Sequence, residues 1–285
     1  MVVLKPMAQA NRLSDMLNKV LGRERFPVAV EALALEYSRQ CFADSPIDKI
    51  HGDHLDGFEG LLKANKARTK WLILFNSAVR SEGRKRFTIA HEFGHYLLHR
   101  HLQSEFACGD AIEAGGASVQ DIEAEANKFA STLLMPFDDL RRQVEGQSIS
   151  FDLLAHCADR YGVSLTAAAL GWIEIAPKRA VLVASRDDHL LWAKSNADAF
   201  KSGAYFATRQ RTIALPDDAL AHSCNCKAFK QCRITQAQRW FPREPASMPL
   251  TEITQIVRQH EYTLTLLLMP DAEWNGYFWP QRRRT

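Results

Sequence analysis

The sequence predicts an α+β protein with a second, separately folded C-terminal part. The chain has 285 residues, which corresponds to about two domains. Its first half alternates stretches of helical periodicity with short β-like stretches, and the pattern changes to alternating strands after residue 176. Apolar residues make up 46% of the chain and charged residues 24%, as in ordinary globular proteins. We therefore expect both parts to bury a core of their own.

Helices and one hairpin dominate the first 145 residues. In the helix expected over residues 118–135, Ser118 is placed to cap the start, with Asp121 in the capping-box position, and Pro136 is expected to end the helix. The predicted elements are two helices within residues 8–42, a hairpin of residues 57–64 and 70–76, a helix over 84–101, a loop over 104–117 and a helix over 118–135.

The remaining residues predict two further parts. Residues 150–173 suggest two short helices in a helix-turn-helix-like arrangement. After Pro177 the strands expected over 180–185, 189–194 and 262–269 alternate with helical stretches, which predicts a separate α/β domain. We therefore divide the chain into residues 1–145, 146–176 and 177–285.

Charge and hydropathy exclude some classes of function. Thirty-six Lys and Arg against 33 Asp and Glu leave a formal charge of +3, too mild to indicate a nucleic-acid partner by itself. The first residues lack the basic-then-apolar pattern of a signal peptide, and the longest apolar runs, such as 71–75 and 264–269, are too short to span a bilayer. We expect a soluble, cytoplasmic protein.

The segment His91-Glu-Phe-Gly-His95 matches the pattern H-E-x-x-H within a predicted helix. Two histidines four residues apart lie on one helix face, about 6 Å apart along the axis, and can share one metal ion. Glu92 beside them can move a proton during the hydrolysis of a peptide bond. A catalytic zinc site needs a third protein ligand and one open position, so the rest of the chain must supply that ligand.

Two other histidines compete for the position of third ligand. His101 nearly completes the extended pattern H-E-x-x-H-x-x-G-x-x-H, but Leu98 stands where that pattern has Gly. A continuing helix would carry His101 about 15 Å along the axis from His91. His99 lies one turn beyond His95. Both are favoured instead as polar residues near a helix end.

The helix over residues 118–135 offers a carboxylate. Glu123 and Asn127 share one face, next to an apolar stripe of mostly small residues that would let this helix approach the first closely. Glu123 could then reach the metal, while Asn127 hydrogen-bonds one of the ligands. Glu125 is the rival, but it lies about 200° around the helix from Glu123, so only one of the two can face the metal.

The segments from Arg86 to His99 and from Glu123 to Pro136 together closely resemble the ImmA/IrrE family of metallo-endopeptidases. The resemblance extends from about residue 10 to residue 173. It implies a zincin-like fold for residues 1–145, with His91, His95 and Glu123 as metal ligands and Glu92 as the general base. It also implies zinc, with manganese as an alternative, and a helix-turn-helix repressor as substrate in a stress or mobile-element response. Residues 177–285 resemble the tails of some family members, one branch of which has a GAF-like sensor fold.

The same region suggests how a substrate would bind. If strand 57–64 or strand 70–76 is a free sheet edge, an extended segment of a substrate protein could pair with it. Direct DNA binding is not expected, because the second short helix, residues 165–174, contains no Lys, Arg, Asn or Gln to contact bases or phosphates.

A second cluster of donor atoms lies near the C-terminus. His222, Cys224, Cys226 and Cys232 fall within eleven residues, which is enough to close a structural metal site. Their spacing differs from the usual C-x₂-C pattern, so a redox role and ordinary thiols stay open alternatives.

Together these features predict a metal-dependent endopeptidase that hydrolyses a peptide bond in a protein, with residues 177–285 as a sensor or recruitment domain. The alternative is a regulatory protein that binds a repressor or toxin without cutting it.

Overall fold

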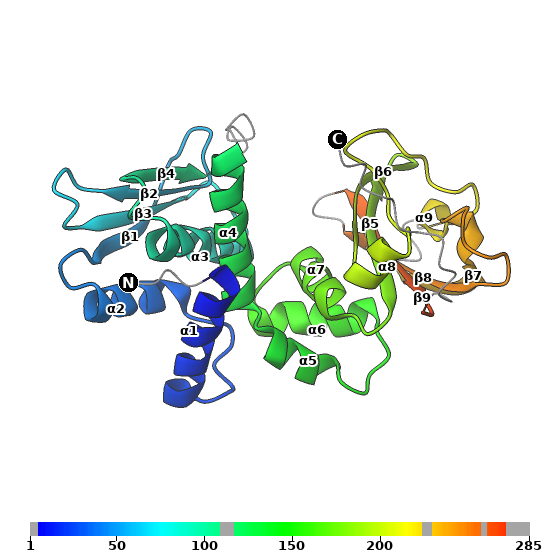
Figure 1. Ribbon diagram of the computed structural model, residues 1–285, viewed down its shortest axis with the longest axis horizontal. Coiled ribbons are helices and arrows are strands. Elements are labelled where there is room, and N and C mark those ends of the chain that lie inside the picture. The colour runs from blue at the N-terminus through cyan, green and yellow to red at the C-terminus, as the bar shows by residue number, and fades with distance from the viewer. Residues whose placement is uncertain (1–4, 109–116, 224–229, 258–260, 272–285) are drawn as a thin grey trace, which may run out of the picture. The chain divides into compact units, whose positions relative to one another are not determined.

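The computed structural model describes residues 5–108, 117–223, 230–257 and 261–271. The chain separates into two compact units, the first made of Met1–Gln143 and His156–Ser164, the second of Val144–Ala155 and Leu165–Thr285. The architecture is mixed α+β, as predicted, with helices and a small sheet in the first unit and an antiparallel sheet in the second (Figure 1). The boundaries expected near residues 145 and 176 stay predictions.

The first unit holds a four-stranded sheet in the order β1-β3-β2-β4. Strands β2 and β3 form the predicted antiparallel hairpin, β1 runs parallel to β3, and β4 pairs antiparallel with β2. The strands are β1 (Ile47–Asp53), β2 (Gly60–Ala64), β3 (Trp71–Asn76) and β4 (Glu105–Cys108).

Two expectations about this sheet were wrong. Neither β2 nor β3 is a free edge, because β1 and β4 take up their outer hydrogen bonds and are themselves the edge strands. The segment expected to be a loop over residues 104–117 begins with β4. In that strand Phe106 and Cys108 are buried while Glu105 is exposed, which is the alternation of a half-buried strand.

Helix α3 (Glu82–Leu98) is the centre of the first unit and lies beside the sheet (Figure 1). Ser81 caps its start by accepting a hydrogen bond from the backbone N–H of Arg84 at 3.3 Å. Every residue from Thr88 to Leu98 is buried. The helix ends at Leu98 rather than at residue 101, and the backbone N–H of His99 closes the last turn onto the His95 carbonyl.

Four further helices of the described residues before position 145 belong wholly or mainly to the first unit. Helix α4 packs against α3 and α1. It ends just before Met135 and Pro136, as predicted. The helices are α1 (Pro6–Leu21), α2 (Val30–Cys41), α4 (Ala117–Leu134) and α5 (Phe137–Val144).

The second unit is built on a five-stranded sheet in the order β6-β5-β9-β8-β7, with every neighbouring pair antiparallel. This corrects the expectation of an α/β domain, because the helices between its strands are too short to cross over a parallel sheet. Strands β7 and β8 were not predicted. The strands are β5 (Arg179–Arg186), β6 (His189–Ser195), β7 (Lys230–Gln236), β8 (Pro249–Val257) and β9 (Tyr262–Met269), and the short helices are α8 (Ala197–Lys201), α9 (Leu220–Ser223) and a 3₁₀ turn (Ala237–Arg239).

The predicted pair of short helices is present as α6 (Phe151–Tyr161) and α7 (Leu165–Ile175). Ala169, Trp172 and Ile173 of α7 are buried in a cluster with Leu182 of β5 and Leu266 of β9. One face of α7 is therefore covered by the sheet of the second unit. Across the described ranges, no helix combines the length and the apolar character that crossing a membrane requires.

Candidate metal centre

Helices α3 and α4 bring together the three predicted ligands. The Nε2 atoms of His91 and His95 lie 2.9 Å apart, which follows from their placement one turn apart on α3. Glu123 of α4 places one carboxylate oxygen 3.2 Å from His91 Nε2 and the other 3.2 Å from His95 Nε2. Three donor groups from two helices thus converge on one point.

The close packing of α3 on α4 depends on Gly94, inside the H-E-x-x-H segment. A Cβ atom added there would lie 2.9 Å from Cδ1 of Phe129 and 3.4 Å from Cα of Ala126. Both Ala126 and Phe129 are fully buried in this contact. The small residues expected on α4 therefore do allow a close approach, and a glycine on α3 completes it.

Each histidine of the motif is held by a partner at its other ring nitrogen. His91 Nδ1 lies 3.0 Å from Oδ1 of Asn127, the contact that the spacing on α4 predicted. His95 Nδ1 lies 3.1 Å from Nδ1 of His99, whose Nε2 lies 3.0 Å from Glu125. Such partners fix the ring orientation and tautomer of metal-binding histidines, leaving both Nε2 lone pairs for the ion.

Cys108 at the end of β4 adds a fourth donor. Its Sγ lies 3.0 Å from His91 Nε2 and 3.5 Å from His95 Nε2. All four donor atoms, from His91, His95, Cys108 and Glu123, lie within 4.8 Å of one another. Cys108 could not be identified as a donor from the sequence, because residues 104–117 carry the pattern of a loop rather than of a strand.

Glu92 lies beside this group and is completely buried. Neither of its carboxylate oxygens has a hydrogen-bond partner among the described residues. Gly60 at the start of β2 makes room for it, since a Cβ atom at that position would collide with Oε1 of Glu92 and with Cγ2 of Thr88. The fold therefore holds an unpaired carboxylate next to the histidines, where a reacting water molecule would be its partner.

The electrostatics of the site separate the roles of its two carboxylates. Burial raises the pKa of Glu92 to about 8, opposed by His91 and by an interaction with the Cys108 thiol and helped by the charge of Glu123. Burial would also raise the pKa of Glu123, but hydrogen bonds from His91 and His95 lower it to about 2. Burial lowers the pKa of His95 to about 4. A permanently ionised Glu123 and a neutral His95 are the forms that bind a cation.

The structure also locates the rival candidates. His101 is exposed and lies outside the group of four donors. His99 is buried but contacts His95 rather than joining the donors, and Glu125 pairs with His99, as expected if only one of the two glutamates faces the metal. His99 therefore orients a ligand, a role that its position one turn after His95 could have suggested.

The second predicted cluster is only partly visible. Cys224 and Cys226 lie outside the described residues. His222 contacts Oδ1 of Asp188 at 2.8 Å through Nδ1 and the carbonyl of Pro216 at 3.0 Å through Nε2, and Cys232 is an exposed free thiol on β7. A metal or redox role for this cluster stays a prediction.

The four donors fit a divalent metal ion on three grounds. Their donor atoms converge, the second ring nitrogen of each histidine has a hydrogen-bond partner, and neither oxygen of the buried Glu92 side chain has a hydrogen bond of normal geometry within the described ranges. An H-E-x-x-H helix with a carboxylate from a second helix defines the class of metal-dependent hydrolases.

Comparison with known proteins finds a family match for part of the chain. Residues 44–172 match the family described as the IrrE N-terminal-like domain, Peptidase_M78. The chain is also similar to the radiation response metalloprotease IrrE of Deinococcus radiodurans, at 37% identity over 108 residues. That alignment covers 37% of this chain and 32% of the relative, so the match spans about a third of the relative's length.

One solved structure resembles nearly the whole chain. A Mycobacterium tuberculosis transcriptional regulator aligns with a TM-score of 0.56 over 93% of this chain and 75% of its own. The sequence identity is 13%, so this likeness concerns the fold alone.

Proposed function

We propose that the protein is a metal-dependent endopeptidase that hydrolyses a peptide bond in another protein. The observation that carries this proposal is Glu92, a fully buried carboxylate without a hydrogen-bond partner among the described residues, next to His91, His95 and Glu123. A purely structural metal site has no use for such a side chain, because burying a polar group without a hydrogen-bond partner costs several kcal/mol by order of magnitude.

Glu92 performs the proton transfers in this proposal. A bound divalent ion would polarise the scissile carbonyl and lower the pKa of water. Glu92 accepts a proton as the water oxygen attacks the carbonyl carbon, and it delivers that proton to the amine that leaves when the C–N bond breaks. Burial raises the pKa of Glu92, which suits a group that must both take up and release a proton.

Zinc is the favoured ion and manganese the alternative. Two imidazoles and one carboxylate suit either ion, but the sulfur of Cys108 within reach of both histidines favours zinc, because thiolates are soft ligands.

A substrate segment would pair with β4. This strand is an edge of the sheet, and its last residue, Cys108, lies among the donors. An extended peptide added to β4 would pass directly beside the site. The strand-addition hypothesis thus moves from β2 and β3 to β4.

The proposed substrate is a helix-turn-helix repressor in a stress or mobile-element response. The ImmA/IrrE resemblance supports this substrate class, and the similarity to a protein named for its radiation response supports a role in stress. Direct DNA binding stays unexpected, since α7 carries no Lys, Arg, Asn or Gln to contact bases or phosphates. We place this cleavage in the cytoplasm.

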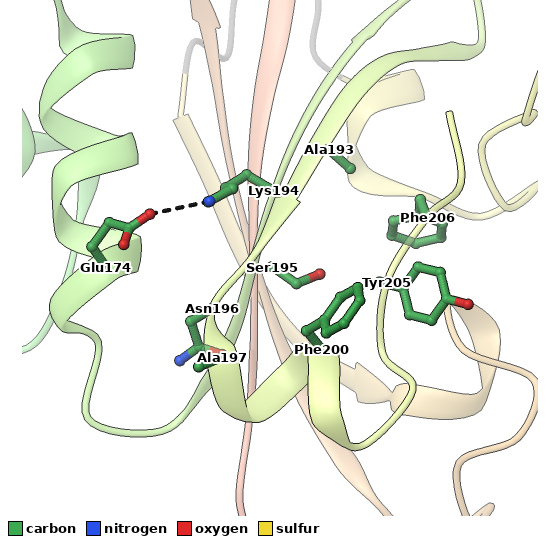
Figure 2. Close-up of a pocket in the computed structure, with 9 residues that line it drawn as sticks. All are labelled: Glu174, Ala193, Lys194, Ser195, Asn196, Ala197, Phe200, Tyr205 and Phe206. Carbon is green, nitrogen blue, oxygen red and sulfur yellow. Dashed lines mark ion pairs between the residues drawn. The ribbon is translucent and has the colours of Figure 1, made fainter. Parts of the chain in front are cut away.

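The second unit would sense a signal or recruit the substrate, and a GAF-like fold is the proposed class. An open pocket of about 470 Å³ supports a ligand-binding role. Figure 2 shows its lining, in which Phe200 and Tyr205 stand together with ring centroids 5.1 Å apart and Lys194 forms a 3.1 Å ion pair with Glu174. Phe200, which lines this pocket, is 61% exposed.

The variant Glu92→Gln tests the proposed function. We would incubate the zinc-loaded full chain with helix-turn-helix repressors encoded in the same genome and identify new N-termini by mass spectrometry. Cleavage by the wild type and by the surface control Glu36→Gln, but not by Glu92→Gln at equal zinc content, is the expected result. Equal cleavage by Glu92→Gln would exclude Glu92 as the general base.

One observation favours the alternative of a non-cleaving regulator. Four protein donors are enough to close a zinc site, and closed sites are typical of structural zinc. Full biological activity of Glu92→Gln in cells would support this second function.

A further inference from the structure

Cys108 lies among the metal ligands although the H-E-x-x-H pattern requires no thiol there. Its Sγ lies 3.0 Å from His91 Nε2, 3.5 Å from His95 Nε2 and 3.9 Å from Glu123 Oε1. The two Nε2 atoms are 2.9 Å apart, and each lies 3.2 Å from an oxygen of Glu123. These six separations join four donor groups pairwise, as the edges of a tetrahedron do.

The separations match those of ligands on one zinc ion. With Zn–N bonds of about 2.0 Å, Zn–S bonds of about 2.3 Å and tetrahedral angles, donor atoms lie roughly 3.3–3.6 Å apart. Of the observed distances, 3.5 Å lies within this range, 3.9 Å lies above it, and the other four, from 2.9 to 3.2 Å, lie below it by at most about 0.4 Å. Sγ of Cys108 therefore lies within the first coordination shell that the other three groups define.

The strand fixes the thiol in this place. Cys108 pairs with Gly60 and Phe106 with Leu62 in the ladder between β4 and β2, and the Cys108 carbonyl accepts a 2.7 Å hydrogen bond from the backbone N–H of Glu59. Alternation along β4 points Phe106 and Cys108 to the same side. Phe106 stacks on His95 with ring centroids 4.7 Å apart, so both residues of β4 that face α3 contact the metal centre.

Charge balance favours the thiolate in a buried site. Glu123 and a Cys108 thiolate supply two negative charges within the ligand set itself, which balance a divalent ion where the His91 and His95 side chains are 7% and 0% exposed. Without the thiolate, the second negative charge would have to come from Glu92 beside the ligands. On coordination the Cys108 thiol gives up its proton to solvent, and the S–H bond is replaced by the bond to the ion.

We propose that Cys108 is a fourth protein ligand that closes the metal centre, so that the described conformation is a latent form of the enzyme. Latency rests on the proposed endopeptidase function, but the ligand assignment does not. A closed centre has no position for a peptide carbonyl, so hydrolysis requires Cys108 to withdraw. Its strand is suited to that movement, because β4 has four residues and pairs with β2 alone among the described strands.

Cobalt spectroscopy of the full chain tests the ligand directly. Co²⁺ occupies tetrahedral zinc sites, and a thiolate ligand adds an intense sulfur-to-cobalt charge-transfer band in the near ultraviolet. We expect this band in the wild type and in the control Cys41→Ser, which lacks an exposed thiol. Cys108→Ala should lose the band but keep the visible bands of Co²⁺ bound by His91, His95 and Glu123. Absence of the band from the Co²⁺-loaded wild type would overturn the proposal even if the variant failed to fold.

Azide tests whether the centre is closed. Azide should shift the visible bands of Co²⁺-loaded Cys108→Ala, in which a coordination position is open, and leave the wild-type spectrum unchanged. Equal shifts in both proteins would contradict closure. In the repressor cleavage assay, Cys108→Ala should be faster than the wild type, and the double variant Cys108→Ala/Glu92→Gln should be inactive. Loss of cleavage in Cys108→Ala with full metal content would overturn latency.

The two proposals fail in distinguishable ways. If the spectra behave as expected but neither the wild type nor Cys108→Ala cleaves a repressor, Cys108 stands as a ligand and the endopeptidase function, with latency, is wrong. If the wild type cleaves and shows no charge-transfer band, the endopeptidase stands and the role of Cys108 is wrong.

Discussion

Nδ1 of His95 lies 3.1 Å from Nδ1 of His99, so one buried histidine orients another. When Nε2 of His95 binds an ion, its Nδ1 carries the proton and donates it to His99. Nε2 of His99 then donates to Glu125 at 3.0 Å. Glu125, His99 and His95 form a continuous chain that ends at the metal centre, with every proton accounted for.

Replacing His99 tests this chain. His99→Phe fills a similar volume but leaves Nδ1 of His95 without an acceptor, so zinc affinity should fall by roughly 10- to 100-fold. Chelator competition would measure the dissociation constant. Glu125→Gln should have a smaller effect, because Glu125 is about half exposed, and His101→Phe, on an exposed side chain, should have none. Unchanged affinity in His99→Phe would show that His95 needs no orienting partner.

The spacing of the two helices leads to a second prediction. Alanine favours a helix over glycine by about 1 kcal/mol, so Gly94→Ala should stabilise α3 by itself. Its Cβ would nevertheless lie 2.9 Å from Phe129, which forces α4 outward and withdraws Glu123. We expect unchanged helix content by circular dichroism but at least about tenfold weaker zinc binding.

A compensating change provides the control for Gly94→Ala. Replacing Phe129 by Leu removes the ring edge that the new methyl group meets, so the double variant Gly94→Ala/Phe129→Leu should regain part of the zinc affinity. If Gly94→Ala alone binds zinc as tightly as the wild type, the approach of α4 does not depend on this glycine.

Gly60 leads to a third prediction that separates chemistry from metal binding. A methyl group at Gly60 would collide with Glu92 and Thr88, so Gly60→Ala should displace the general base while leaving His91, His95 and Glu123 in place. A loss of about 100-fold in repressor cleavage is expected, in the range that one general base contributes. Zinc content, measured in the same samples, should stay at the wild-type level. Joint loss of zinc and cleavage would instead indicate a wider disruption of the sheet.

Much of the site could be predicted from the sequence, because its key residues are close to one another in the sequence on each of two helices. A period of 3.6 residues places His91 with His95 and separates Glu123 from Glu125, and the structure keeps both relationships. The hairpin of β2 and β3 could also be predicted, because two β-like stretches of sequence are joined by a polar segment.

The features that escaped the sequence analysis depend on contacts between distant segments. Strand β4 has four residues and no strong pattern, so its pairing with β2, and with it the place of Cys108, becomes visible only in the folded chain. Strand β1 could not be predicted for the same reason. It pairs parallel with β3, and no short turn joins the two strands to mark that pairing in the sequence. Gly60 and Gly94 matter through the atoms that face them, which a single sequence does not show.

A fourth prediction concerns Asp139, a carboxylate with 4% of its side chain exposed in the first unit. Arg142 contacts it at 2.6 Å, Arg160 at 2.9 Å, and the Tyr161 hydroxyl donates to it at 2.7 Å. Although burial alone would raise the pKa of Asp139, these hydrogen bonds lower it. Asp139→Asn removes the buried anion that Arg142 and Arg160 share and leaves them only their exposed partners, Asp138 and Glu24. The variant should therefore destabilise the protein by about 3 kcal/mol in chemical denaturation.

The dependence of this stabilisation on pH follows from the direction of the shift. A carboxyl group whose pKa is lower in the folded chain stabilises the fold above its unfolded pKa of about 3.9, and this contribution is lost as pH falls through the folded value. The difference in unfolding free energy between the wild type and Asp139→Asn should therefore be constant above about pH 5 and shrink below about pH 4. Asp138→Asn is the matched control, because Asp138 is exposed and contacts only Arg142 at 3.3 Å among the ion pairs described, so it should change stability by less than about 0.5 kcal/mol. A difference for Asp139→Asn that stays constant from pH 6 to about pH 3 would show that the ionised carboxylate is not the source of the stabilisation.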